Sequence, residues 1–358
     1  MTPDDSVLLV QPERLVPHLV EFPRPNLEAF ESPLRITAID RYLRQQEVFG
    51  RIQTAQAVMA SVSDIERVHS GYLVDTVALM SELGSGEIGE AAIASPHLLE
   101  AALYAVGSAI LACDRVVSKA ARHAFAIARP PGHHASHCCP MGLCFFNNIA
   151  VAVKRALQRG QVKRVSVLDF DDHFCDGTAE IFYTNADVQV ISVHEYDHVN
   201  NGPGHFGQLG RGSARGTKVN VPLFMGASDK TYSSVISRVI VQAIERFQPD
   251  LIAVSAGFDA HFADPVGNMD VDSSTFWRFG SIVDRLVESV GAAGSFWVLE
   301  GGYNPLALGP CVEASLLGLM GRPMPRLPDQ VARDEDTELE KMNEDIIDQV
   351  IETVSPLW

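Results

Sequence analysis

An apolar segment that ends in a cluster of acidic residues constrains this chain most. The segment 163–178 reads KRVSVLDFDDHFCDGT, and its apolar first half predicts a buried strand. Ligands of open α/β sheets bind beyond the carboxyl ends of the strands. Asp171 and His173 therefore form a candidate pair of ligands for zinc or another divalent ion, with Asp169 and Asp176 beyond them. Taken alone, the segment could equally be an acidic loop with its charges in water.

Length and composition bound the class of protein. The 358 residues, 46% hydrophobic and 20% charged, suit one large α/β domain or two smaller ones around a sizeable core. We find no eighteen-residue apolar span and no signal peptide, and the six cysteines show no zinc-ribbon spacing, so we expect a soluble cytoplasmic protein with reduced thiols and no membrane partner. The net charge of −17 argues against nucleic acid as a partner and would favour a cationic substrate.

Strand and helix patterns alternate along the chain and predict a parallel sheet with helices on both faces. Apolar strand patterns begin near residues 7, 125, 165, 189, 250 and 295, with helical patterns between most of them. We also expect helix over residues 36–60 and a flexible acidic loop over 82–90. A charged helix near 335–354 suggests a division into a catalytic domain, 1–322, and a helical extension, 323–358. This helix or the loops could support a homo-oligomer.

Four strand ends carry side chains suited to amide hydrolysis. A metal held by Asp171, His173 and Asp259 would leave an open position for water and lower its pKa. The carboxylates of Asp169 and Asp176 could each orient one of two adjacent histidines. The hydroxyl of a tyrosine after two glycines could stabilise the developing oxyanion. The two adjacent histidines are His133 and His134, and the tyrosine after two glycines is Tyr303.

The ordered motifs RPPGHHA, DFDDHFCDGT, SAGFDA and EGGYN resemble those of the zinc-dependent histone deacetylase superfamily. That superfamily includes acetylpolyamine amidohydrolases and bacterial deacetylase-like amidohydrolases, and the resemblance covers residues from about 20 to 321. It implies a single-domain arginase/deacetylase fold, an eight-stranded mostly parallel sheet flanked by helices. It also implies hydrolysis of the amide bond of a small-molecule substrate.

The resemblance implies a role for each matching residue. Zn²⁺ would be bound by Asp171, His173 and Asp259, and His134, paired with Asp176, would be the main general base and acid. His133 would pair with Asp169, and Tyr303 would polarise the carbonyl. A structural K⁺ would lie near Asp169, Asp171, His173 and Ser192, and a second monovalent cation near Phe182, Asn185 and Val188. The substrate pocket and the cavity behind the metal would include Arg35, Gly142, Leu143, Asn201, Gly202, Gly301 and Gly302.

The sequence departs from the family pattern around the metal and the tunnel. Phe174 and Cys175 stand where the family has a second histidine and a glycine, and Leu143 replaces a tunnel phenylalanine. The opposite wall falls near Asn201 and Gly202 without an aromatic. We therefore expect acetylated small amines or other small amides, rather than acetyl-lysine peptides, as substrates. Protein acetyl-lysine deacetylation and a weakly catalytic binding role are the alternatives. The candidates for an acidic residue that contacts the substrate backbone are Glu87 and Glu90.

Overall fold

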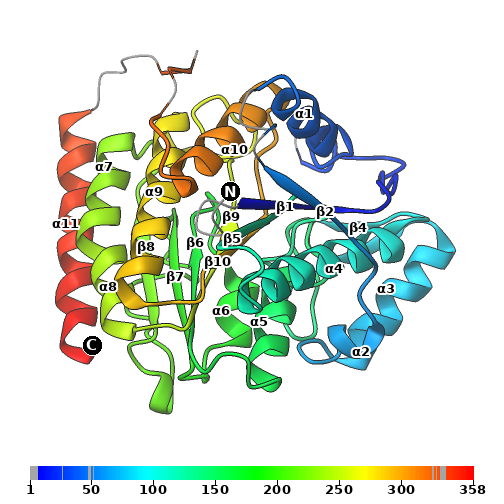
Figure 1. Ribbon diagram of the computed structural model, residues 1–358, viewed down its shortest axis with the longest axis horizontal. Helices are drawn as coiled ribbons and strands as arrows, with labels where there is room; N and C mark the ends of the chain where they lie inside the picture. The colour runs from blue at the N-terminus through cyan, green and yellow to red at the C-terminus, as the bar shows by residue number, and fades with distance from the viewer. Residues whose placement is uncertain are drawn as a thin grey trace.

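The fold is built on one sheet of eight parallel strands in the order β2-β1-β5-β10-β9-β6-β7-β8 (Figure 1). The structure, a computed structural model, describes residues 7–25, 27–46, 50, 52–324, 326–327, 329–330 and 336–358. The strands are β1 Val7–Pro12, β2 Gln53–Ala57, β5 His123–Ala126, β6 Val165–Asp169, β7 Val188–Glu195, β8 Lys218–Leu223, β9 Leu251–Ala256 and β10 Ser295–Leu299. This is the predicted α/β architecture.

Helices cover both faces of the sheet and form two separate cores with it. The helices are α1 Leu34–Leu43, α2 Val62–Ile65, α3 Gly71–Leu83, α4 Leu98–Val117, α5 Asn148–Gln158, α6 Asp176–Ile181, α7 Asp229–Val235, α8 Val241–Phe247, α9 Ser273–Val290, α10 Pro305–Leu319 and α11 Thr337–Val354. Successive strand residues point to opposite faces, so Leu168 of β6 joins the core under α9 and α10, whereas Val167 joins the core under α4 and α5. Both faces being covered explains the continuous apolar runs in the strands.

The parallel register brings the carboxyl ends of β6, β9 and β10 together. Asp169 of β6 pairs with Ser255 of β9 on one side and Ser192 of β7 on the other, and Leu299 of β10 pairs with Ala256 of β9. The loops that leave these strands therefore begin side by side. They carry most of the side chains that the sequence singled out.

Two local predictions were wrong. The segment 36–60 is not one helix: α1 ends at Leu43, and Gln53–Ala57 forms the edge strand β2 on β1. Only Ala57 of β2 is buried, so the segment lacks the alternation of apolar residues that would predict a strand. It forms a strand because its backbone pairs with the edge of β1. The segment 82–90 is not simply a loop, because Gly86–Gly89 (β3) pairs in an antiparallel hairpin with Ala92–Ala94 (β4).

The C-terminal helix α11 packs against α7 and the edge strand β8 (Figure 1). Ile346, Ile347, Val350 and Val354 are buried in the core on that face of the sheet. Arg238 also donates to Glu344, with a nitrogen–oxygen distance of 2.6 Å. The helix therefore belongs to the packed body of the fold and is not an appendage, while a domain boundary near residue 322 stays a prediction.

None of the described helices is long and apolar enough to cross a membrane.

Candidate active site

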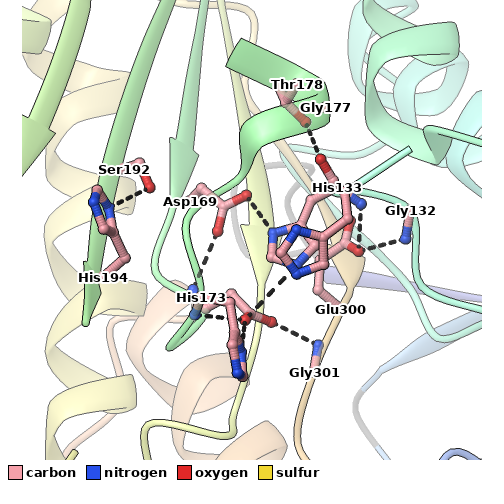
Figure 2. Close-up of polar contacts among 12 residues, drawn as sticks. Gly132, His133, Asp169, His173, Gly177, Thr178, Ser192, His194, Glu300 and Gly301 are labelled. Atoms are coloured by element: carbon pink, nitrogen blue, oxygen red, sulfur yellow. Dashed lines mark hydrogen bonds and ion pairs between the residues drawn. The ribbon is translucent and has the colours of Figure 1, made fainter. Parts of the chain in front are cut away.

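Asp171, His173 and Asp259 meet at the carboxyl edge of the sheet. His173 Nδ1 lies 3.2 Å from Asp171 Oδ1 and 3.2 Å from Asp259 Oδ2. Both carboxylates are buried, whereas the His173 side chain is 40% exposed, so the imidazole faces the solvent side of the group. Figure 2 shows His173 and, on the other side of the Asp171 carboxylate, the N–H of Gly301, the second residue after β10. The three predicted metal ligands are thus brought together from two loops.

Backbone groups orient both carboxylates. The N–H of Gly301 donates to Asp171 Oδ2 at 2.8 Å, and the N–H of Asp172 donates to Asp259 Oδ1 at 3.0 Å. The other oxygen of each carboxylate faces His173. Glycine is required beside them, because a Cβ on Gly301 would lie 2.1 Å from Asp259 Oδ2, and one on Gly257 would lie 2.1 Å from Asp171 Oδ2.

The donor set fits a divalent metal ion. One imidazole and two carboxylates are ligands that zinc accepts in catalytic sites, where a fourth position stays open. Although burial opposes it, hydrogen bonds from His173 to Asp171 and Asp259 raise the pKa of His173 well above its ordinary value. The two buried carboxylates therefore favour a positive charge at this point, as a metal site requires.

The adjacent histidines lie next to this group, each with its own carboxylate. They follow β5, and their ring centroids are 4.1 Å apart. His133 Nδ1 lies 3.2 Å from Asp169 Oδ2, and His134 Nδ1 lies 2.7 Å from Asp176 Oδ1. Figure 2 shows the first of these contacts, together with the hydrogen bond that ties the His133 carbonyl to the start of α6. Both pairings match the sequence prediction.

The two histidines differ in basicity. Burial opposes protonation of His133, but Asp171 and Asp169 raise its pKa well above the ordinary value. Burial and the neighbouring His133 lower the pKa of His134, and Asp176 only partly offsets them. The two imidazoles therefore differ in their tendency to bind a proton, and His134 is the one more readily left neutral and able to accept one. Two titratable groups with pKa values pushed apart are typical of acid–base catalysis.

Tyr303 is buried beside the metal ligands. Burial raises the pKa of its phenol well above the ordinary value, so the hydroxyl keeps its proton and can donate. The guanidinium carbon of Arg35 lies 4.7 Å from the centre of the Tyr303 ring. Asp264 Oδ2 accepts from the backbone N–H of Tyr303 at 2.6 Å and of Asn304 at 3.1 Å. Asp264 thus places the tyrosine, a role that the sequence analysis did not assign to it.

Arg35 supports the backbone behind the metal ligands. Its Nε donates to the carbonyl of Gly302 at 2.7 Å, and a second nitrogen donates to the carbonyl of Glu300. Glu31 lies between Arg35 and Arg129, and Arg129 Nε donates to Glu31 Oε1 at 2.9 Å. The predicted cavity residue is therefore part of a buried charged network that holds the glycine turn.

Glu300 is a second residue that the sequence analysis missed. Its Oε2 accepts from the N–H groups of Gly132 at 2.6 Å and His133 at 3.1 Å (Figure 2). Its Oε1 is buried without a hydrogen-bond partner among the described residues. Burial raises the pKa of Glu300 to about 7. A charged residue directly after the apolar strand β10 was the signal that could have identified it.

The predicted pocket residues fall into two groups. A Cβ on Gly142 would lie 2.4 Å from His134 Cδ2, and the Leu143 N–H donates to the Ala91 carbonyl at 2.8 Å, so residues 142–143 join His134 to the β3–β4 hairpin. By contrast, Gly202 is exposed, and its carbonyl accepts from the Tyr196 hydroxyl at 3.0 Å. Asn201 is exposed as well, and its N–H donates to the Asp197 carbonyl. A wall made by these two residues stays a prediction.

The residues of the first predicted cation site also lie together. Ser192 pairs in register with Asp169, whose Oδ1 accepts from the Asp171 N–H at 3.2 Å. The Ser192 hydroxyl contacts His194 Nδ1 at 2.9 Å, as Figure 2 shows. Of the two departures, Phe174 packs its ring 4.8 Å from that of His194, and Cys175 is buried before α6. Neither replaces a metal ligand.

Comparisons with known proteins agree with this geometry. A family model described as the histone deacetylase domain matches residues 29–319. The histone deacetylase-like amidohydrolase of Pseudomonas aeruginosa is 35% identical over 291 residues, which cover 81% of this chain and 77% of the relative. A probable deacetylase of Archaeoglobus fulgidus is 33% identical over 316 residues, covering 86% of this chain and 87% of the relative.

The fold has a close structural match as well. The crystal structure of the HDA15 HD domain superposes with a TM-score of 0.87 at 29% identity, covering 99% of this chain and 96% of that one. The matched family region contains every residue of the site described above, from Arg35 to Tyr303. The chain therefore belongs to the histone deacetylase family.

Proposed function

We propose that this protein is a zinc-dependent amidohydrolase that releases acetate or another small acyl group from acetylated amines or other small amides. Its family already makes it a hydrolase of the deacetylase and amidohydrolase type. The observation that carries the finer proposal is the arrangement of side chains at one sheet edge. Two histidines of unequal basicity and a buried, protonated tyrosine lie next to three residues whose side chains could hold a metal ion.

Zn²⁺ bound by Asp171, His173 and Asp259 would act as a Lewis acid on the substrate carbonyl and lower the pKa of an attacking water. His134 then accepts the proton of that water and passes it to the leaving amine, because its pKa is the lower of the pair. Asp176 holds the His134 ring through Nδ1 and thereby directs Nε2 to the reaction.

His133 and Tyr303 act on the charge that develops on the carbonyl oxygen. His133, whose Nδ1 lies 3.2 Å from Asp169 Oδ2, presents its Nε2 on the side of the metal ligands, 3.7 Å from Asp171 Oδ1. The hydroxyl of Tyr303 donates a hydrogen bond to the oxyanion, and Asp264 and Arg35 hold the tyrosine in place beforehand. Preorganised donors of this kind contribute roughly 3 kcal/mol to transition-state stabilisation.

The substrate preference rests on Leu143 and on the net charge of the chain. Leu143 is apolar but has no flat ring that could pack on the extended methylene chain of an acetyl-lysine. Burial of each methylene contributes about 0.8 kcal/mol to binding, and an acetyl-lysine substrate would lose part of this contribution. The net charge of −17 favours amides of cationic amines.

Turnover of a substrate panel with matched metal analysis tests the proposal. The panel is an acetyl-lysine peptide, acetylated polyamines and a neutral anilide, and the small amides should have the higher kcat/KM. A protein acetyl-lysine deacetylase, which the family assignment also allows, would favour the peptide by tenfold or more, about 1.4 kcal/mol. Stoichiometric zinc without turnover on any amide would instead indicate a binding protein, and a fully active Asp259→Ala variant would refute the ligand assignment.

A further inference from the structure

Lys218 places its amino group in a buried position at the edge of the sheet, away from the metal ligands. It is the first residue of β8, and only 1% of its surface is exposed. The aliphatic part of the Lys218 side chain packs against Gly210. A Cβ added to Gly210 would lie only 3.2 Å from Lys218 Cγ, so a larger residue there would crowd the lysine. A lysine is rarely this buried unless its ammonium is fully bound.

Three oxygens bind the ammonium. Lys218 Nζ donates to the Val188 carbonyl at 2.6 Å, to Thr217 Oγ1 at 2.8 Å and, more weakly, to the Asn185 carbonyl at 3.4 Å. The Thr217 hydroxyl gives its own proton to the Ala214 carbonyl, so it presents a lone pair to Nζ. Three N–H bonds thus meet three acceptors, which satisfies the donor capacity of an ammonium.

These partners are uncharged, and two of them are backbone carbonyls. None of the ion pairs found in the described part of the chain involves Lys218. Carbonyl and hydroxyl oxygens that converge without a carboxylate are typical ligands of a monovalent cation such as K⁺. Burial lowers the pKa of Lys218 to about 7, and the three oxygens oppose this by favouring the charged form.

The Lys218 amino group lies where the family resemblance implies a second monovalent cation. Phe182, Asn185 and Val188 were expected near a second monovalent cation, yet the carbonyls of Asn185 and Val188 accept from Lys218. We propose that Lys218 is a tethered monovalent cation, which occupies this site permanently and makes the turn 182–188 independent of K⁺ in solution. The inference concerns this turn and does not rest on the proposed reaction.

The turn matters because of what it connects. It leads from α6, whose first residue Asp176 binds His134, into β7. A cavity of about 440 Å³ lies between α6, Lys218 and Phe174, which would give an ion a route to the carbonyls once the amine is removed. Without Lys218, K⁺ should therefore be able to replace the ammonium.

Thermal melting of the full chain tests this with Lys218→Met, Lys218→Gln and, as a matched surface control, Lys163→Met. Melts are compared in KCl and in tetramethylammonium chloride at equal ionic strength. The wild type and the control should show the same difference between salts. Both Lys218 variants should melt about 5 °C lower in tetramethylammonium and regain a large part of this in K⁺. The glutamine variant, which keeps N–H donors without charge, guards against a failure of the methionine variant to fold.

Rubidium-soaked crystals locate the ion. The variants should show an anomalous peak near the Asn185 and Val188 carbonyls that the wild type lacks. A rubidium peak at that place in the wild type would overturn the proposal. So would variants that are destabilised equally in both salts, which would make Lys218 a structural lysine only, or variants that melt like the wild type in both.

Discussion

Gly301→Ala should weaken metal binding at the proposed site without removing any ligand. The glycine lies directly behind two carboxylates, and a Cβ there would lie 2.1 Å from Asp259 Oδ2 and 2.6 Å from Asp171 Oδ2. The backbone of Gly301 does not have a positive φ, so alanine is sterically allowed in the main chain. The effect of the substitution therefore comes from the contact with the carboxylates alone.

The magnitude follows from the distances. Real Cβ atoms essentially never approach closer than 3.0 Å, so Asp259 Oδ2 must move by at least 0.9 Å, from 2.1 to 3.0 Å. Metal–ligand distances tolerate only about 0.2 Å. Changes in the groups around a metal's ligands typically cost 10–100-fold in affinity. Displacing a ligand should exceed this, so we expect the zinc Kd to weaken by about 100-fold or more, about 2.8 kcal/mol.

Competition with a fluorescent zinc chelator measures this Kd, and amide turnover measured with added zinc should recover only at the higher metal concentration. Gly71→Ala at the start of α3 is the matched control, because its Cβ would meet only Glu66 Oε1, at an ordinary 3.8 Å. Melting curves of the metal-free proteins should show that both variants remain folded, with a lower melting temperature for Gly301→Ala because its Cβ crowds two buried carboxylates. A Gly301→Ala protein with wild-type zinc affinity would refute the proposed packing of glycine against the ligands.

Three further substitutions test other parts of the site. Tyr303→Phe should lower kcat/KM by about 100-fold at unchanged zinc content, and nearly native turnover would remove the phenol from the mechanism. Asp176→Asn should move the acidic limb of the kcat/KM profile to lower pH, because Asp176 raises the pKa of His134; an unmoved limb would contradict this. Glu31 is buried, which opposes its charge, yet Arg129 lowers its pKa to about 2, so its stabilising effect is complete above about pH 4.5 and is lost as pH falls towards 2. Glu31→Gln should therefore cost about 3–5 kcal/mol in urea unfolding at pH 7 and flatten the stability profile over that window, which an unchanged acid slope would disprove.

Sequence by itself determined the parts of this protein that depend on neighbours in the chain. The apolar strand that ends in Asp169 could be predicted because its side chains are buried on both faces of a parallel sheet. Asp171 and His173 could be paired because they lie two residues apart in one loop. Asp272 caps α9, because its Oδ1 accepts from the Ser274 N–H at 2.7 Å, and an aspartate directly before an amphipathic segment is a local signal of such a cap. In such cases local geometry restricts the outcome before any tertiary contact forms.

Tertiary structure alone decided features whose cause lies far away in the chain. Asp264 holds Tyr303 across 39 residues, and Glu300 holds the N–H of His133 across 167 residues. No local pattern distinguishes such a carboxylate from one that is solvated, since its role depends on which backbone groups the sheet brings to it. Lys218 shows the same limit: its sequence context is that of an ordinary strand residue, and only the turn at Val188 makes it a buried cation.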